Sequence, residues 1–136
     1  MSSSSSSGAV WTPVLLCGCG CEHYRAVKME WQTHPMSAGN QGTADTAHHA
    51  VLVYFVCAKC GNENRRTYDL FDDGKKCRWG YYRRYYKICR DTKLNVSYER
   101  VEDVFRGMWE KMPPVMIGHA TSIIVRKQRA RGRTPF

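Results

Sequence analysis

Five of the seven cysteines in this 136-residue chain fall into two tight groups. Cys17, Cys19 and Cys21 alternate with glycines, and Cys57 and Cys60 form a CxxC pair that is followed by a glycine. Zinc in structural sites takes four thiolate or imidazole ligands at tetrahedral corners, and tight turns that carry cysteine pairs deliver such ligands. The spacing therefore predicts one structural Zn²⁺ ion, held by Cys57, Cys60, Cys19 and either Cys17 or Cys21.

Other ligand sets remain open at this level. His23 follows the first group closely and is a reserve ligand. Cys77 and Cys89 are a rival pair that would complete a site with Cys57 and Cys60. Buried free thiols are the plainest alternative, because cysteine is a common core residue.

The same motifs argue against an enzyme. Thiol oxidoreductases place a helix directly after the CxxC pair to lower the thiolate pKa, whereas residues 61–64 here are typical of a turn. A zinc deaminase needs a His-x-Glu sequence for its proton shuttle, and the chain contains none. A four-cysteine zinc site is closed to water. We therefore expect no catalytic residues and no small-molecule substrate.

A basic and aromatic segment is the second chemical signal. Residues 75–90 hold seven basic side chains, no acidic ones and five aromatics, and residues 126–133 form a second basic cluster. Cations neutralise phosphates and aromatic rings stack on unpaired bases, so this mixture favours nucleic acid as the partner, with RNA preferred. The predicted nucleic-acid-binding residues are Lys75, Lys76, Arg78, Trp79, Arg83, Arg84, Lys87, Arg90, Arg126, Lys127, Arg129, Arg131 and Arg133.

Two structural alternatives accompany that prediction. In one, residues 81–90 form a helix whose tyrosines and Cys89 face the core while the basic side chains form a solvated face. In the other, residues 126–133 are a solubilising tail. The first alternative would leave phosphate binding intact but would remove base stacking.

The charge distribution supports a polyanionic partner. The chain has 21 Lys and Arg against 12 Asp and Glu, a net charge of +9, and residues 61–136 carry all of the excess. No apolar run reaches the length of about 18 residues that a membrane span needs, so we expect no membrane partner. The N-terminus lacks the features of a signal peptide, which favours an intracellular protein of the cytoplasm, the nucleus or both. Thiols in those compartments are reduced and available for metal.

The elements that must position these residues follow from hydrophobic periodicity. Strands are expected over residues 10–16, around Val27 to Trp31, over 51–57 and over 66–70, in an antiparallel β-meander joined by a long loop at 32–49. The segment from Ser97 to Met112 places apolar residues on one helical face, with Ser97 as its N-cap and prolines after its end. Met116 to Val125 favours a last short strand pair.

The expected architecture is thus an α+β fold, a zinc-ribbon-like β-meander with one long amphipathic helix packed on it and a basic tail. Residues 1–9 are a disordered serine-rich tail, residues 10–125 form a single zinc-binding domain and residues 126–136 form a basic arm. Within the domain, residues 10–70 form the ribbon and residues 71–125 the basic, helical half.

The first cysteine group, Tyr24, Ala26, Val27 and the run from Val51 to Gly61 together resemble the zinc-ribbon class. The layout is similar to the 3CxxC zinc-binding family, to ribbons of transcription elongation factors and to small cysteine-rich proteins of plant RNA viruses that suppress RNA silencing. The resemblance covers residues 10–70 and implies a zinc-binding regulatory protein, either a viral silencing suppressor or a transcription-associated factor.

Two functional hypotheses result. The first is a zinc-dependent protein that binds nucleic acid, with RNA preferred. The second is a protein-interaction adaptor that presents the ribbon edge and the Trp109 helix face to a host or polymerase protein.

Overall fold

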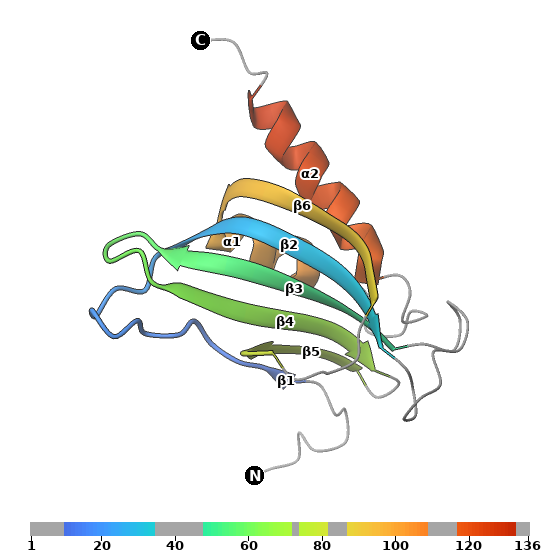
Figure 1. Ribbon diagram of the computed structural model, residues 1–136, viewed down its shortest axis with the longest axis horizontal. Helices are drawn as coiled ribbons and strands as arrows, with labels where there is room; N and C mark the ends of the chain where they lie inside the picture. Colours follow the sequence, from blue (N-terminus) through green and yellow to red (C-terminus); the bar gives the residue numbers. More distant parts are fainter. Residues whose placement is uncertain (1–9, 35–47, 72–73, 82–86, 109–116, 133–136) are drawn as a thin grey trace.

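The computed structural model describes residues 10–34, 48–71, 74–81, 87–108 and 117–132, although the side chains of 70, 71 and 129–132 are left out. The described residues form a mixed α+β structure with a six-stranded sheet and two helices (Figure 1). Its strands are β1 (Val10–Trp11), β2 (Tyr24–His34), β3 (His48–Cys57), β4 (Glu63–Phe71), β5 (Gly74–Trp79) and β6 (Lys87–Ser97). Its helices are α1 (Tyr98–Arg106) and α2 (His119–Gly132).

The sheet is mostly antiparallel, in the order β1-β5-β4-β3-β2-β6. Strands β2, β3 and β4 are consecutive antiparallel neighbours, which confirms that part of the expected meander, and β5 extends it. The strand expected over residues 10–16 is only Val10–Trp11 and lies outside the meander. Strand β6 pairs with the outer edge of β2, and the short β1 lies parallel to β5. Strand β3 lies in the middle, as its run of β-branched and aromatic residues favours.

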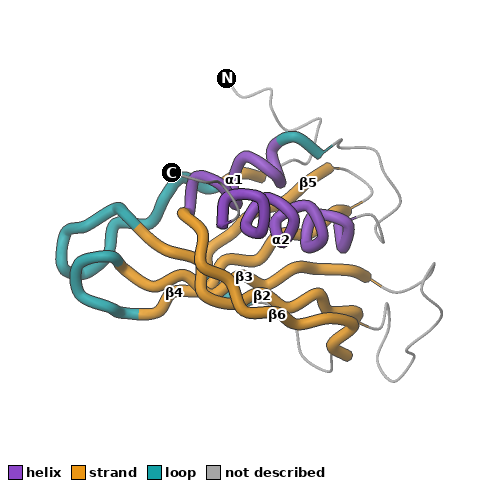
Figure 2. Tube along the Cα trace, turned by 90° about the horizontal axis from the view of Figure 1, so that it is seen from above, coloured by secondary structure: helices purple, strands orange, loops and turns teal. Residues whose placement is uncertain are grey.

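Both helices cover one face of the curved sheet (Figure 2). Alternate residues of the central strands, among them Met29, Val53 and Phe55, point to that face and are buried with the apolar residues of the helices. We call the opposite side the helix-free face; by register it carries Lys28, Tyr54 and their cross-strand neighbours. None of the helices in the described part of the chain is long and apolar enough to cross a membrane.

Helix α1 confirms the start of the predicted helix but is shorter than expected. The Ser97 side chain accepts a hydrogen bond from the Arg100 N–H, as an N-cap does, and Val101, Val104 and Phe105 are buried. The helix ends at Arg106 rather than Met112, so a single long helix is not what forms. Lys75 Nζ donates to the carbonyls of Phe105 and Arg106, which satisfies the last turn. Residues 109–112 lie outside the described residues.

Helix α2 corrects two predictions. The segment expected to form a strand pair, Thr121 to Val125, is helical, and so are residues 126–132 of the expected basic arm. Ile117, Ala120, Thr121, Ile124 and Val125 are all buried at helical spacing, so packing on the sheet overrides their local β-propensity. Gly118 sits so close to the Trp31 indole that a Cβ there would overlap the ring, which lets the helix begin against the sheet.

A buried ion pair joins α1 to the sheet. Glu102 Oε2 accepts from Arg66 Nε at 3.1 Å, and Glu102 Oε1 accepts from Arg66 Nη2, also at 3.1 Å. The hydroxyls of Tyr68 and Tyr98 and the indole N–H of Trp11 also donate to this carboxylate. Both carboxylate oxygens of Glu102 therefore accept more than one hydrogen bond, which is the condition under which a buried charge is tolerated.

We expect Glu102→Gln to lower the free energy of unfolding by about 3–5 kcal/mol, because the Arg66 charge would stay buried without its counter-charge. Urea unfolding followed by circular dichroism measures this. Asp103→Asn, which changes an exposed carboxylate next to it, is the control and should change stability by less than about 0.5 kcal/mol. A loss below about 1 kcal/mol for Glu102→Gln would show that the pair does not hold the helix.

Candidate metal centre

The first cysteine group folds as a tight turn between β1 and β2. Gly20 N–H donates to the Cys17 carbonyl at 2.8 Å, and Cys17 N–H donates to the Cys21 carbonyl at 3.0 Å. Gly20 has a φ of 92°, a conformation that glycine adopts without strain. The turn is tied to the sheet because the Tyr24 hydroxyl donates to the Leu15 carbonyl at 2.6 Å.

The CxxC pair forms the second turn, between β3 and β4. The N–H groups of Lys59 and Cys60 point at Cys57 Sγ, at 3.4 Å and 3.5 Å. Gly61, with a φ of 80°, closes the turn by donating to the Cys57 carbonyl at 3.0 Å. Backbone donors aimed at a sulfur are what stabilise a ligating thiolate, so this turn is built to hold one.

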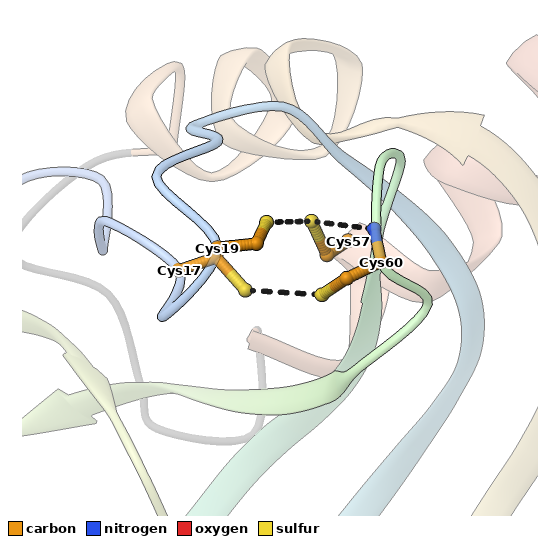
Figure 3. Close-up of side chains that lie close together, drawn as sticks. All are labelled: Cys17, Cys19, Cys57 and Cys60. Atoms are coloured by element: carbon orange, nitrogen blue, oxygen red, sulfur yellow. Dashed lines mark hydrogen bonds between the residues drawn. The ribbon is translucent and has the colours of Figure 1, made fainter.

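The two turns bring four sulfur atoms together (Figure 3). Cys17 Sγ lies 3.4 Å from Cys60 Sγ, Cys19 Sγ lies 3.5 Å from Cys57 Sγ, and all four lie within 4.8 Å of one another. A tetrahedral ion with metal–sulfur bonds of about 2.3 Å holds its sulfurs about 3.8 Å apart. The cluster therefore could bind a metal ion, consistent with a zinc-binding class.

The remaining cysteines take other places. Cys21 Sγ accepts from the His23 N–H at 3.4 Å and is not a member of the cluster, although the spacing left it open as a ligand. Cys77 is buried beside Glu102, and Cys89 is exposed on β6. The four neighbouring sulfurs thus include those of Cys17 and Cys19 but not that of Cys21, and neither Cys77 nor Cys89 belongs to the cluster.

The environment makes the two CxxC thiols unequal. The N–H groups of Cys60 and then Lys59 lower the pKa of Cys57 to about 6, so this thiol ionises readily. The Asn62 N–H lowers the pKa of Cys60, but hydrogen bonding to Cys17 and burial outweigh it and raise that pKa to about 12. A cation that replaced the shared protons would relieve this competition, since metal ligation requires the thiolates.

The predicted nucleic-acid-binding residues are scattered. Lys75 is buried and caps α1, and the Trp79 ring packs against Phe55 and Tyr98, so both are used within the fold. Arg78 lies 3.7 Å from Asp69. Lys76 lies on β5, and Lys87, Arg90, Arg126 and Lys127 are exposed on β6 and α2. Arg129 and Arg131 are placed in α2 without their side chains, and Arg83, Arg84 and Arg133 lie outside the described residues.

A basic groove lies where β2, β6, α1 and α2 meet. It encloses about 360 Å³ and is lined by Arg25, Asn95, Val96, Ser97, Arg100, Lys127 and Gln128. Arg25, Arg100 and Lys127 form no ion pair with a described residue, and no acidic side chain of the described part lines the groove. Of these three cations, only Lys127 is predicted from the sequence. Arg25 lies in the first half of the chain, where basic and acidic residues are equal in number, and Arg100 lies on the predicted helix.

No protein-family model, no curated protein and no solved structure matches this chain.

We expect the purified protein to carry one metal ion, and Cys19→Ser to lose it because only three thiolates would remain. Mass spectrometry under native conditions measures the stoichiometry. Cys21→Ser is the matched control: it lies in the same turn, outside the cluster, and should keep the ion. Loss of the metal from Cys21→Ser, with retention by Cys19→Ser, would contradict this ligand set.

Proposed function

We propose that this protein binds nucleic acid, and that a structural Zn²⁺ ion on Cys17, Cys19, Cys57 and Cys60 holds the surface that does so. Zinc fits the donor set, because four thiolates in a closed tetrahedral cluster are typical of structural zinc. The two cysteine turns are also what a zinc ribbon uses. No catalytic role is proposed, since a site with four protein ligands has no open position for water or substrate.

The basic groove is the observation that carries the binding proposal. Three cations line one hollow without a counter-charge from the described residues, and like charges held together repel each other. A phosphate group relieves that repulsion. The side-chain oxygens of Asn95, Ser97 and Gln128 already accept hydrogen bonds within the fold, and their amide N–H and hydroxyl groups are donors that a phosphate could use. The whole-chain charge of +9 favours the approach of a polyanion.

The groove lies beside the cysteine cluster. Tyr24 pairs with Cys57 across β2 and β3, and Arg25 pairs with Val56 in the next register position. A metal that fixes Cys57 therefore also fixes the strand ends that present Arg25. The alternative of a protein-interaction adaptor would use the edge of the sheet and the Trp109 helix face, and Trp109 lies outside the described residues.

We expect binding of a labelled RNA to weaken steeply with salt, and Lys127→Gln to reduce the log–log salt slope by about 0.7–0.9, the value of one phosphate contact. Fluorescence anisotropy over a salt series measures both quantities.

Lys87→Gln is the matched control, because it removes a lysine that is also exposed but lies at the other end of β6, about 33 Å from Ser97 along the strand. Equal effects of the two variants would mean that net charge, and not the groove, attracts the RNA. Affinity that does not depend on salt would contradict the proposed function itself.

A further inference from the structure

A second hollow lies on the opposite side of the cysteine cluster from the basic groove, where β4 begins and β5 ends. It encloses about 440 Å³ and is lined by Leu15, Asn64, Arg65, Trp79 and Tyr81 together with Glu63 and Gly80. Its walls therefore combine aromatic edges with both hydrogen-bond donors and acceptors. That mixture suits a nucleobase, which presents a flat ring with donors and acceptors on its edge.

A row of side chains on the helix-free face leads from the second hollow toward the basic groove, and its last member, Lys93, lies two residues before the groove residue Asn95 on β6. The register places Lys93 opposite Lys28, Lys28 opposite Tyr54, and Tyr54 opposite Arg65. These four residues come from β6, β2, β3 and β4, which are successive neighbours in the sheet. With about 4.8 Å between strands, the row spans about 14 Å. Arg65 belongs to both the row and the second hollow, so the two are continuous.

Tyr54 is the aromatic centre of this row. Lys28 Nζ lies 5.2 Å and Arg65 Cζ 5.6 Å from the centroid of its ring. The Tyr54 hydroxyl donates to Glu30 Oε2 at 3.2 Å, and that carboxylate is buried, so the ring is held in place from below. The Lys28 and Arg65 side chains are 43% and 49% exposed, and each lies beside a carboxylate: Lys28 Nζ is 3.1 Å from Glu30 Oε2, and Arg65 Nε is 4.0 Å from Glu63 Oε1. A phosphate would therefore compete with these carboxylates for the two cations.

The arrangement places phosphate-binding groups on either side of a fixed ring. Phosphates that draw the Lys28 and Arg65 heads outward would uncover the Tyr54 ring for a base, and stacking on an aromatic ring contributes about 1–3 kcal/mol per base. Only an unpaired base can enter such a stack, because duplex bases are already stacked and paired.

We propose that a single-stranded nucleic acid crosses the helix-free face from the basic groove to the Trp79–Tyr81 hollow and stacks one base on Tyr54. This inference rests on the proposed function and names its ligand class. The phosphates contact the groove cations, Lys28 and Arg65, and a second base enters the far hollow.

The test compares Tyr54→Leu with Tyr54→Phe, using a fluorescein-labelled oligouridylate of roughly ten nucleotides. Loss of the ring should weaken binding about 5- to 150-fold, which is the stacking energy expressed as an affinity ratio. Tyr54→Phe keeps the ring and should stay within about threefold of the parent protein. A duplex of equal length should bind more weakly than the single strand and should not respond to Tyr54→Leu. Circular dichroism and metal content establish that each variant is folded.

A second measurement uses the unaltered protein. An oligonucleotide carrying 5-iodouridine forms a photochemical cross-link to a stacked aromatic residue, and peptide mass spectrometry should locate it at Tyr54. Cross-links at other residues, together with full affinity in Tyr54→Leu, would overturn the proposed path of the single strand across the helix-free face. The proposed function would still stand in that case if Lys127→Gln reduced the salt slope. If the unaltered protein binds neither RNA nor DNA, both proposals fail together.

Discussion

The buried pair of Glu102 and Arg66 is the constraint on which the rest of the structure depends. A desolvated carboxylate is tolerated only when all its donors are present, so the segments that supply them must dock in one arrangement. Trp11 comes from β1, Arg66 and Tyr68 from β4, and Tyr98 from α1 itself. If one of these segments moved, the buried Glu102 carboxylate would lose a hydrogen-bond donor or its counter-charge.

That arrangement also sets where the cysteine turns begin. Arg66 donates to both the side chain and the carbonyl of Thr12, so the chain leaves a fixed point five residues before Cys17. The same arginine lies on β4, close behind the turn that carries Cys57 and Cys60. The ion pair thus holds the bases of the two turns, and a bound metal would hold their tips.

The sequence predicted the elements whose residues act locally. The CxxC turn, the central strand and the Ser97 cap all depend on neighbours in the chain, and each is present. Helix α2 was missed because its β-branched run has strand propensity, and only the buried spacing from Ile117 to Val125 makes it helical. Glu102 stands in the first turns of the predicted helix, where a carboxylate is favourable whether or not it is buried. Three of its partners, Tyr68, Arg66 and Trp11, lie 34 to 91 residues away, and no local pattern contains them.

The proposed nucleic-acid-binding surface also depends on contacts between residues that are distant in the sequence. Tyr54 belongs to an apolar run and looks like a core residue, but strand alternation turns it to the helix-free face, where Lys28 and Arg65 meet it from both neighbours. Arg25, the groove cation nearest the cysteines, pairs one register position from the strand end that holds Cys57. Metal and nucleic acid would then act on the same strand ends, and by linkage any factor by which the metal changes the affinity for nucleic acid is also the factor by which nucleic acid changes the affinity for the metal.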